Sequence, residues 1–371
     1  MKKLFVLAMV LVLTCTMVFA QTAVESKSTV RSTHVVVDHN DVAVSVPTDI
    51  QRIAVTGIYP LPSVLTVFFN SAEKIVTMNT PSLSAAKAGL LGQLYPEILK
   101  VDDKPVATGG AKINIEELIA LKPDVVFYST RDEGEAITAA GIPAVGISVN
   151  KWDYNAIETL DHWLELLAQL FPADADKAEK VHDFSMKAYN LVQDRVRDIP
   201  QNERARVFIL FQYSPTVMKS SGKHFFGQWW CDAIGAINVG QDIDLDNSVD
   251  VNLEQVYAWN PDVILITNFT STQPEELLSG KVNEDDWSSI RAVKDGRVYK
   301  MPLGMYRSYT PGVDTPVTLM WLAKTVYPSL FTDIDIIEFA KDYYSSVFGV
   351  LLTDEQVNSI FAPPASAATG F

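Results

Sequence analysis

The sequence predicts an α/β protein made of two lobes, each built on a parallel sheet, and three observations lead to this fold. The stretch "NIEELIALKPDVVF" (residues 114–127) recurs without a gap as "NLEQVYAWNPDVIL" (residues 252–265), 138 residues later. Short apolar runs alternate with helical segments on both sides of the chain's centre, as in parallel sheets. The length of 371 residues exceeds the usual size of one hydrophobic core.

The first part of the chain predicts a cleaved secretory signal over residues 1–20. Two lysines at positions 2 and 3 precede an apolar run over residues 4–13, and "VFA" then supplies small residues for a signal peptidase. Lipid anchoring at Cys15 is not expected. A lipoprotein signal has leucine three residues before the cysteine and a small residue directly before it, and here these positions hold Val12 and Thr14. We therefore expect a soluble periplasmic protein with no direct membrane insertion.

Removing the signal leaves Cys231 as the one cysteine, so no intramolecular disulfide is expected. Its apolar helical surroundings favour a buried thiol. The formal charge is −15. That charge disfavours nucleic acid and anionic membranes as partners.

The order of strand and helix patterns along the chain predicts its division into domains. A polar, disordered stretch precedes an alternating segment at residues 34–47 that predicts a hairpin. A long amphipathic helix, with acidic residues in its first turn and arginines in its last, divides the two α/β regions and indicates a connecting strut. Residues 212–226 are expected to form a long loop. The expected parts are a disordered start (21–32), an N-terminal α/β lobe (33–172), a connecting helix (173–199) and a C-terminal α/β lobe with terminal helices (200–371).

Several segments resemble one known family in the family's order. They are "VSVPTDIQRIAV", "NIEELIALKPDVVF", "GIPAVGI", "AVKDGRVYKMP" and "WLAKTVYPSLF". The chain is identified as similar to the periplasmic substrate-binding proteins of ABC importers that capture iron–siderophore complexes, haem or cobalamin. This resemblance implies two Rossmann-like lobes joined by a single long α-helix, with a ligand cleft between them. It covers essentially the whole chain after the signal.

The loops that follow the carboxyl ends of parallel strands are where ligands bind in such sheets. Aromatic and hydroxyl side chains dominate these loops, together with two arginines, which suits a bulky and partly anionic metal chelate. The alternative for Arg131 is a surface ion pair with Asp132 or Glu133, and the tyrosines of the last loop have the alternative of covering the C-terminal lobe. The predicted ligand-binding residues are Tyr59, Arg131, Tyr213, Phe226, Asn268, Tyr306, Arg307 and Tyr309.

The repeated motif carries a second hypothesis. In the family an exposed acidic residue on each lobe docks onto the membrane permease, and the matching positions here are Glu116 and Glu254. The alternative is helix capping, but each glutamate stands two residues after its asparagine, whereas a capping box uses the third.

The sequence disfavours two other classes of function. The five histidines show no spacing that would gather ligands for bare zinc or manganese, apart from His34 and His39 in the hairpin. The nucleophile-elbow, zinc-protease and phosphate-binding motifs of common enzymes are missing.

We therefore expect a monomeric binding protein, not an enzyme, that needs no cofactor. It would deliver a metal chelate, with a ferric siderophore favoured, to an ABC permease dimer. Haem, cobalamin and oxyanions such as molybdate or tungstate stay open as ligands. A periplasmic enzyme or chelatase on the same scaffold is the alternative of another class.

Overall fold

The computed structural model describes residues 31–106 and 113–370. The expected signal peptide, including Cys15, and nearly all of the stretch expected to be disordered lie outside the described residues. The described residues from Ser32 onward belong to one compact unit. Within the part that the structure describes, no helix is long and apolar enough to cross a bilayer.

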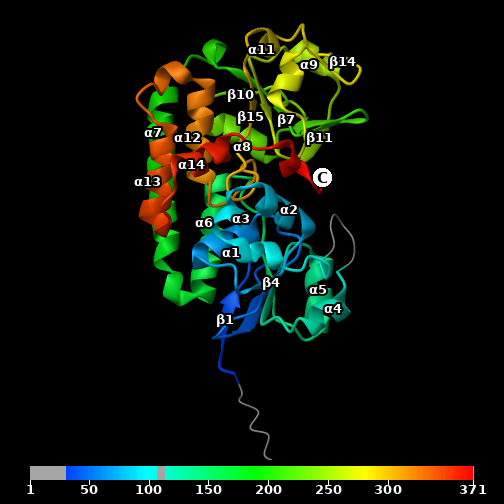
Figure 1. Cartoon of the computed structure of the whole chain (residues 1–371), viewed down its shortest axis with the longest axis vertical. Coiled ribbons are helices and arrows are strands. Elements are labelled where there is room, and N and C mark those ends of the chain that lie inside the picture. The colour runs from blue at the N-terminus through cyan, green and yellow to red at the C-terminus, as the bar shows by residue number, and fades with distance from the viewer. Residues whose placement is uncertain (1–30, 107–112, 371) are drawn as a thin grey trace, which may run out of the picture. The chain divides into compact units, whose positions relative to one another are not determined.

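The N-terminal lobe (N-lobe), coloured blue to teal in Figure 1, contains a parallel sheet with the strand order β4-β3-β5-β6. Strands β3 and β5 are buried along their whole length, because helices cover both faces of the sheet, and they therefore read as continuous apolar runs. The strands are β3 (Ile53–Val55), β4 (Ile75–Thr77), β5 (Val125–Tyr128) and β6 (Ala144–Gly146). The helices are α1 (Leu61–Phe69), α2 (Thr80–Ala88), α3 (Leu90–Leu94), α4 (Ile115–Ala120) and α5 (Arg131–Ala139).

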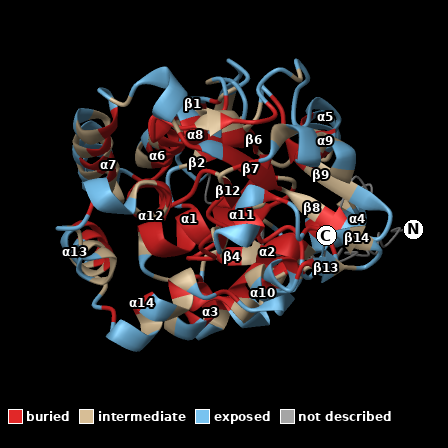
Figure 2. Cartoon of the chain, turned by 90° about the horizontal axis from the view of Figure 1, so that it is seen from above, coloured by how far each residue is buried: buried red, intermediate tan, exposed pale blue. Residues whose placement is uncertain are grey.

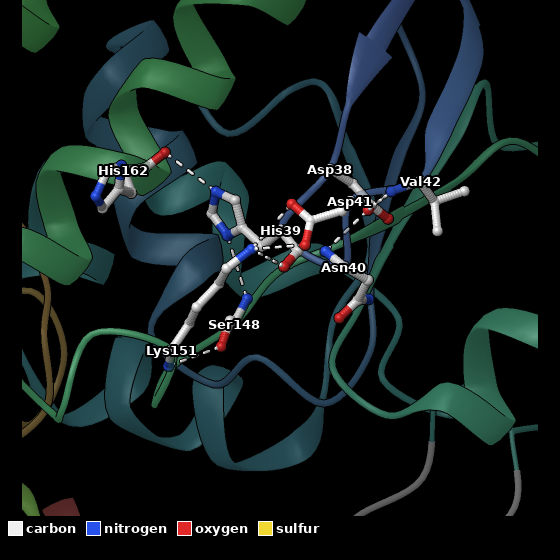
Figure 3. Close-up of polar contacts among 8 residues, drawn as sticks. All are labelled: Asp38, His39, Asn40, Asp41, Val42, Ser148, Lys151 and His162. Carbon is white, nitrogen blue, oxygen red and sulfur yellow. Dashed lines mark hydrogen bonds and ion pairs between the residues drawn. The ribbon is translucent and has the colours of Figure 1, made fainter.

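The predicted hairpin is confirmed as strands β1 (Thr33–Val37) and β2 (Ala43–Pro47), which pair antiparallel. His39, in the turn between β1 and β2, connects the hairpin to the N-lobe by two hydrogen bonds. Nδ1 of His39 accepts a hydrogen bond from the backbone N–H of Ser148 at 3.2 Å, and Nε2 lies 3.2 Å from the carbonyl oxygen of His162 (Figure 3). These partners require a neutral ring with its proton on Nε2. Burial, aided by the charges of His162 and Lys151, lowers the pKa of His39 to about 4.

The C-terminal lobe (C-lobe) has a second parallel sheet, with the strand order β10-β7-β12-β15. Its strands are β7 (Arg206–Leu210), β10 (Ile237–Asn238), β12 (Val263–Ile266) and β15 (Val298–Lys300). Its helices are α8 (Phe226–Ala233), α9 (Leu253–Trp259), α10 (Pro274–Leu278), α11 (Arg291–Lys294) and α12 (Thr315–Val326).

The stretch expected to be a long loop after β7 is partly ordered into strands. A three-stranded antiparallel sheet forms from β8 (Gln212–Ser214), β9 (Val217–Ser221) and β11 (Ser248–Asp250). These strands are short and largely polar, so no apolar alternation marks them in the sequence. A smaller hairpin, β13 (Lys281–Val282) with β14 (Asp285–Asp286), lies further along the chain.

One long helix belongs to both lobes. Helix α7 (Asp176–Val196) has 21 residues, or about 30 Å at ~1.5 Å per residue. Val181 near its start is part of the N-lobe core, whereas Val192 and Val196 near its end are part of the C-lobe core. The helix therefore packs one apolar face against two separate cores.

Helices α6 (Ala156–Leu170) and α13 (Ile336–Phe348) lie beside α7, and α14 (Asp354–Phe361) packs against α13 and α3. Tyr343 and Tyr344 of α13 and Val357 and Ile360 of α14 pack into the same apolar cluster as the N-lobe sheet. The chain thus returns to the N-lobe after the C-lobe sheet is complete. Figure 2 shows exposed outer turns on α7 and α13, whereas α1 is buried.

The repeat has the same structural role in both lobes. The carboxylate of Asp124 accepts hydrogen bonds from the backbone N–H groups of Gln51 and Arg52 at 2.8 and 2.9 Å, just before β3. Asp262, at the matching position, accepts one from the N–H of Arg206 at the start of β7, at 2.9 Å. The guanidinium of Arg52 in turn donates to the carbonyl oxygen of Leu121 at 2.7 Å, and Arg206 repeats this contact in the C-lobe. The Pro-Asp pair therefore holds the neighbouring strand in register.

Candidate ligand-binding site

The segment between β15 and α12, residues 301–314 (the β15–α12 loop), is buried almost throughout although it has no regular structure. Asp314 holds it in place. Its carboxylate accepts a 2.7 Å hydrogen bond from the N–H of Met305 and another from the phenol of Tyr344 on α13. Gly304 has φ +58°, and a Cβ there would lie 2.4 Å from the Asp314 carboxyl carbon, so the tight approach requires glycine. Burial raises the pKa of Asp314 to about 6.

Arg307 on this loop is fully buried, at 0% exposure, where the two lobes meet. Its Nε donates to the carbonyl oxygens of Asn268 at 3.1 Å and Ala367 at 2.9 Å. Its Nη1 donates to the carbonyl of Pro81 in α2 at 2.9 Å, and its Nη2 to that of Thr369 at 3.0 Å. One guanidinium thus contacts the N-lobe, the C-lobe and the last described segment of the chain.

Tyr306 and Phe269 lie beside this guanidinium, and Tyr59 lies near Tyr306. Its central carbon is 5.2 Å from the ring centre of Tyr306 and 5.6 Å from that of Phe269, within the range of cation–π attraction. The phenol of Tyr306 also accepts a 3.2 Å hydrogen bond from Nη1. Burial raises the pKa of Tyr306 to about 12, although Arg307 opposes the shift, and the charge of nearby Tyr59 adds to it. The structure therefore brings three predicted site residues together here: Tyr59, Tyr306 and Arg307.

Asn268, also predicted, lies beside them at the end of β12. Its amide Nδ2 donates to the carbonyls of Met301 and Pro302, at 2.8 and 3.0 Å, and so ties the start of the β15–α12 loop to the neighbouring strand. Its Oδ1 is buried and has no hydrogen-bond partner among the described residues. Such an atom is costly unless something else satisfies it.

Tyr309 and Phe226 belong to an aromatic cluster on the C-lobe side of the cleft. The phenol of Tyr309 accepts a 2.9 Å hydrogen bond from the N–H of Gly227 at the start of α8, and its carbonyl accepts one from Nε1 of Trp230 at 2.8 Å. Burial raises the pKa of Tyr309 far above its usual range. Ring contacts join Tyr309 to Phe211, Phe225, Phe226 and Phe269. Both predicted residues are packed into the lobe, with Phe211 and Phe225 half-buried above them.

The phenol of Tyr213 has partners other than Arg307. Its hydroxyl contacts the carboxylate of Asp285 at 2.6 Å and the carbonyl of Val282 at 3.0 Å, and burial together with Asp285 raises its pKa to about 12. Tyr213 nevertheless borders a cavity of about 440 Å³. That cavity is also lined by Phe269, Thr270, Ser271, Ala365, Ala368 and Thr369.

Arg131 lies apart from this group, at the start of α5. Its side chain is 89% exposed and pairs with Glu135 at 2.7 Å, one turn along the helix. It borders a different cavity, of about 1020 Å³, between α5 and the β1–β2 hairpin. A ligand contact for Arg131 stays a prediction.

Sequence reasoning missed several residues that shape the site. Lys300 is buried at the end of β15 and donates to the carbonyls of Thr270 and Thr272 at 2.6 and 2.7 Å, and burial lowers its pKa to about 7. Asp314 was also missed. Two sequence signals could have identified these residues. Lys300 stands inside an apolar strand, and Asp314 stands directly before a helix that begins with Thr-Pro. No sequence signal places Ala367 and Thr369 beside Arg307.

The two candidate docking glutamates occupy matching surface positions. Glu116 and Glu254 are exposed, each at the second residue of its helix, α4 or α9. The asparagine caps bind the third residue in both lobes, and in α9 the reciprocal bond comes from Gln255. The capping bonds therefore involve the residues next to Glu116 and Glu254, and the carboxylates of these two glutamates are exposed to solvent.

Within the described residues, no three His, Cys, Asp or Glu side chains gather in a group that could hold a metal ion. The hairpin histidines contact backbone carbonyls instead, His34 that of Gln169 and His39 that of His162. The described site is thus a buried guanidinium with aromatic rings around it, next to the 440 Å³ cavity that Phe269 and Thr369 line.

Two parallel-sheet lobes, a helix shared by both cores and a site between the lobes define a bilobal solute-binding protein. Residues 77–303 match the family model described as periplasmic binding protein. This span is more than half of the chain, so the protein belongs to that family. The resemblance inferred from the sequence, to the substrate-binding proteins of ABC importers, is confirmed.

Individual relatives agree with this assignment. The molybdate-binding protein MolA of Haemophilus influenzae is 30% identical over 266 residues, which cover 64% of this chain and 70% of MolA. The solved structure of MolA with molybdate covers 86% of this chain and 99% of its own, with a TM-score of 0.71 and 25% identity. A periplasmic solute-binding protein from Veillonella parvula covers 92% of this chain and 100% of its own, with a TM-score of 0.79 and 26% identity.

Proposed function

We propose that this protein captures a tetrahedral oxyanion of the molybdate class in the periplasm and delivers it to an ABC permease. The observation that carries the proposal is the buried guanidinium of Arg307 between the lobes. A planar fork of N–H donors with a permanent charge matches the oxygens of an oxyanion, and its attraction is strong where water is excluded.

The surroundings support a small ligand. The chain as a whole carries a formal charge of −15, so anion capture needs a local positive centre that is shielded from the surface carboxylates. Arg307 supplies it, and its contact partners Phe269 and Thr369 line a cavity of about 440 Å³ that has room for an oxyanion with its water. The 30% identity with the molybdate-binding MolA supports the same ligand class.

A metal chelate such as a ferric siderophore, which the sequence favours, is the second candidate. The observation behind it is a larger cavity of about 920 Å³ between the lobes, bordered by the aromatic rings of Tyr154, Phe225 and Trp229. However, five carboxylates line that cavity against two basic residues, Lys223 and His224, so the excess negative charge would repel an anionic chelate. The carboxylates belong to Asp153, Asp232, Asp242, Asp244 and Asp246. We therefore rank the oxyanion first.

Binding, not catalysis, is the activity in this proposal. The lobes enclose the ligand, and Glu116 and Glu254 present one carboxylate per lobe to basic residues of a permease dimer. The exposure of both glutamates at matching positions supports this step.

Isothermal titration of the mature protein with molybdate, tungstate and sulfate tests the proposal, with ferric siderophores, haem and cobalamin as the competing panel. We expect a dissociation constant for molybdate in the micromolar range or below, which corresponds to about −8 kcal/mol. Tight binding of a siderophore with no heat from molybdate would replace the first candidate by the second.

A further inference from the structure

The last described stretch of the chain, residues 365–370 (the C-terminal segment), lies against Arg307, Pro81 and the 440 Å³ cavity. It follows α14 and runs between α2 of the N-lobe and the C-lobe (Figure 1). Ala367 and Ala368 are buried in it, although the segment is made of small and polar residues with little apolar surface of its own.

The contacts of the segment are made through its backbone. The carbonyl oxygens of Ala367 and Thr369 accept hydrogen bonds from Nε and Nη2 of Arg307, at 2.9 and 3.0 Å. Gly370, at φ +99°, lies against Pro81 of α2. Ala365, Ala368 and Thr369 form one wall of the 440 Å³ cavity. The segment thus covers two donor groups of the buried guanidinium.

We propose that the C-terminal segment is an internal competitor that occupies the anion site and is displaced when the ligand binds. This rests on the proposed oxyanion function. Carbonyl oxygens and oxyanion oxygens are acceptors for the same N–H donors, but the oxyanion adds a full negative charge. Nε also donates to the carbonyl of Asn268, so the direct competition is for Nη2, which Thr369 now occupies. Ligand and segment cannot both use this donor, so binding and seating of the segment exclude each other.

Competition by the C-terminal segment lowers the apparent affinity for the ligand. While the segment is seated the site cannot bind, so the apparent affinity is the intrinsic affinity multiplied by the fraction of molecules with the site free. A segment seated nine-tenths of the time would weaken binding about tenfold. In return, the carbonyls satisfy the donors of a buried charge that would otherwise be costly in the empty protein.

Deleting residues 365–371 tests the competition, because the deletion leaves α14 and the buried Pro363 in place. We expect the dissociation constant for molybdate, measured by isothermal titration, to fall about tenfold relative to the full chain. Equal affinities in the two proteins, or weaker binding after deletion, would overturn the competitor while leaving the oxyanion function intact. Absence of molybdate binding in both would overturn the oxyanion function and the competitor with it.

A second measurement keeps the C-terminal segment and does not depend on how well the deletion variant folds. Ala368→Cys places a thiol at a position that is 8% exposed in the cavity wall, and Ser366→Cys places one at an exposed position two residues away. Both are made in the mature protein without residues 1–20, where Cys231 is buried and does not compete for reagent. Saturating molybdate is expected to speed thiol labelling at 368 at least about fivefold and to leave 366 unchanged. No acceleration at 368, or protection there, would contradict displacement.

Discussion

The Nη1 atom of Arg307 donates a 2.9 Å hydrogen bond to the carbonyl oxygen of Pro81, so a side chain of the C-lobe loop is held by the backbone of the N-lobe. This contact places a permanent positive charge at the junction of the lobes. Any change in lobe separation therefore changes the surroundings of the one group that the proposed anion must reach.

The repeated Pro-Asp predicts a stability effect. Asp124→Ala removes the acceptor for the N–H groups of Gln51 and Arg52 ahead of β3. Leaving such donors without a partner costs roughly 1–3 kcal/mol of unfolding free energy. We expect a fall of this size in urea denaturation, and a similar fall for Asp262→Ala.

Asp124→Asn is the matched control, because its amide keeps an acceptor oxygen, and it should recover part of the loss. The losses of the two alanine variants should add in the double variant, since the aspartates share no partner and stand in different sheets. Loss of molybdate affinity without loss of stability would show that the aspartates have some role other than holding the strands.

Asp314 predicts one trend of stability with pH. Its folded pKa of about 6 lies above the ordinary value of 3.8, so between these values the folded protein binds more protons than the unfolded chain. The contribution of Asp314 is therefore present at low pH and is lost as pH rises from about 4 to 6. Relative to Asp314→Asn, the wild type should lose on the order of 2 kcal/mol over this range. A parallel pH dependence in both proteins would refute the assignment.

His39 predicts the opposite trend. Its folded pKa of about 4 lies below 6.5, so between these values the unfolded chain binds more protons and stability rises with pH. The contribution is full above pH 6.5 and is lost as pH falls toward 4. Relative to His39→Gln, the wild type should lose on the order of 2 kcal/mol between pH 7 and pH 4.5 in urea denaturation. If the two proteins keep a constant difference across this range, the ring is not buried as a neutral group.

The docking hypothesis predicts a separation of binding from transport. Glu116→Lys combined with Glu254→Lys should leave the dissociation constant for molybdate within about twofold, because both side chains are exposed on helices away from Arg307. Uptake into proteoliposomes with the cognate permease and ATPase should fall at least about tenfold, since like charges would meet at the contact. Glu117→Lys, at the neighbouring exposed position, is the control. Normal uptake by the double variant would exclude these glutamates as docking contacts.

The sequence predicted the two sheets because their signals are local and repeated. The 138-residue repeat placed β5 and β12, and the Pro-Asp pair directly before each strand marks where the strand begins. The long helix was also predicted, since its charges and length lie within one continuous stretch.

The site was predicted only in part, because its contacts join distant parts of the chain. Loop position and residue type singled out Arg307, Tyr306 and Tyr59. The carbonyls of Pro81 and Thr369 carry no side-chain signal, and they lie 226 and 62 residues from Arg307. For Tyr213, composition could not show that its hydroxyl hydrogen-bonds to Asp285, 72 residues away.

Titration of Arg307→Lys with molybdate tests the central claim most directly. Lysine keeps the charge but loses the planar fork of donors, so binding should weaken about 10- to 100-fold, equivalent to about 1.5–3 kcal/mol. Arg197→Lys, which changes an exposed arginine paired with Asp194, should bind as the wild type does. Wild-type affinity in Arg307→Lys, with its fold verified by thermal unfolding, would contradict the proposed role of the guanidinium.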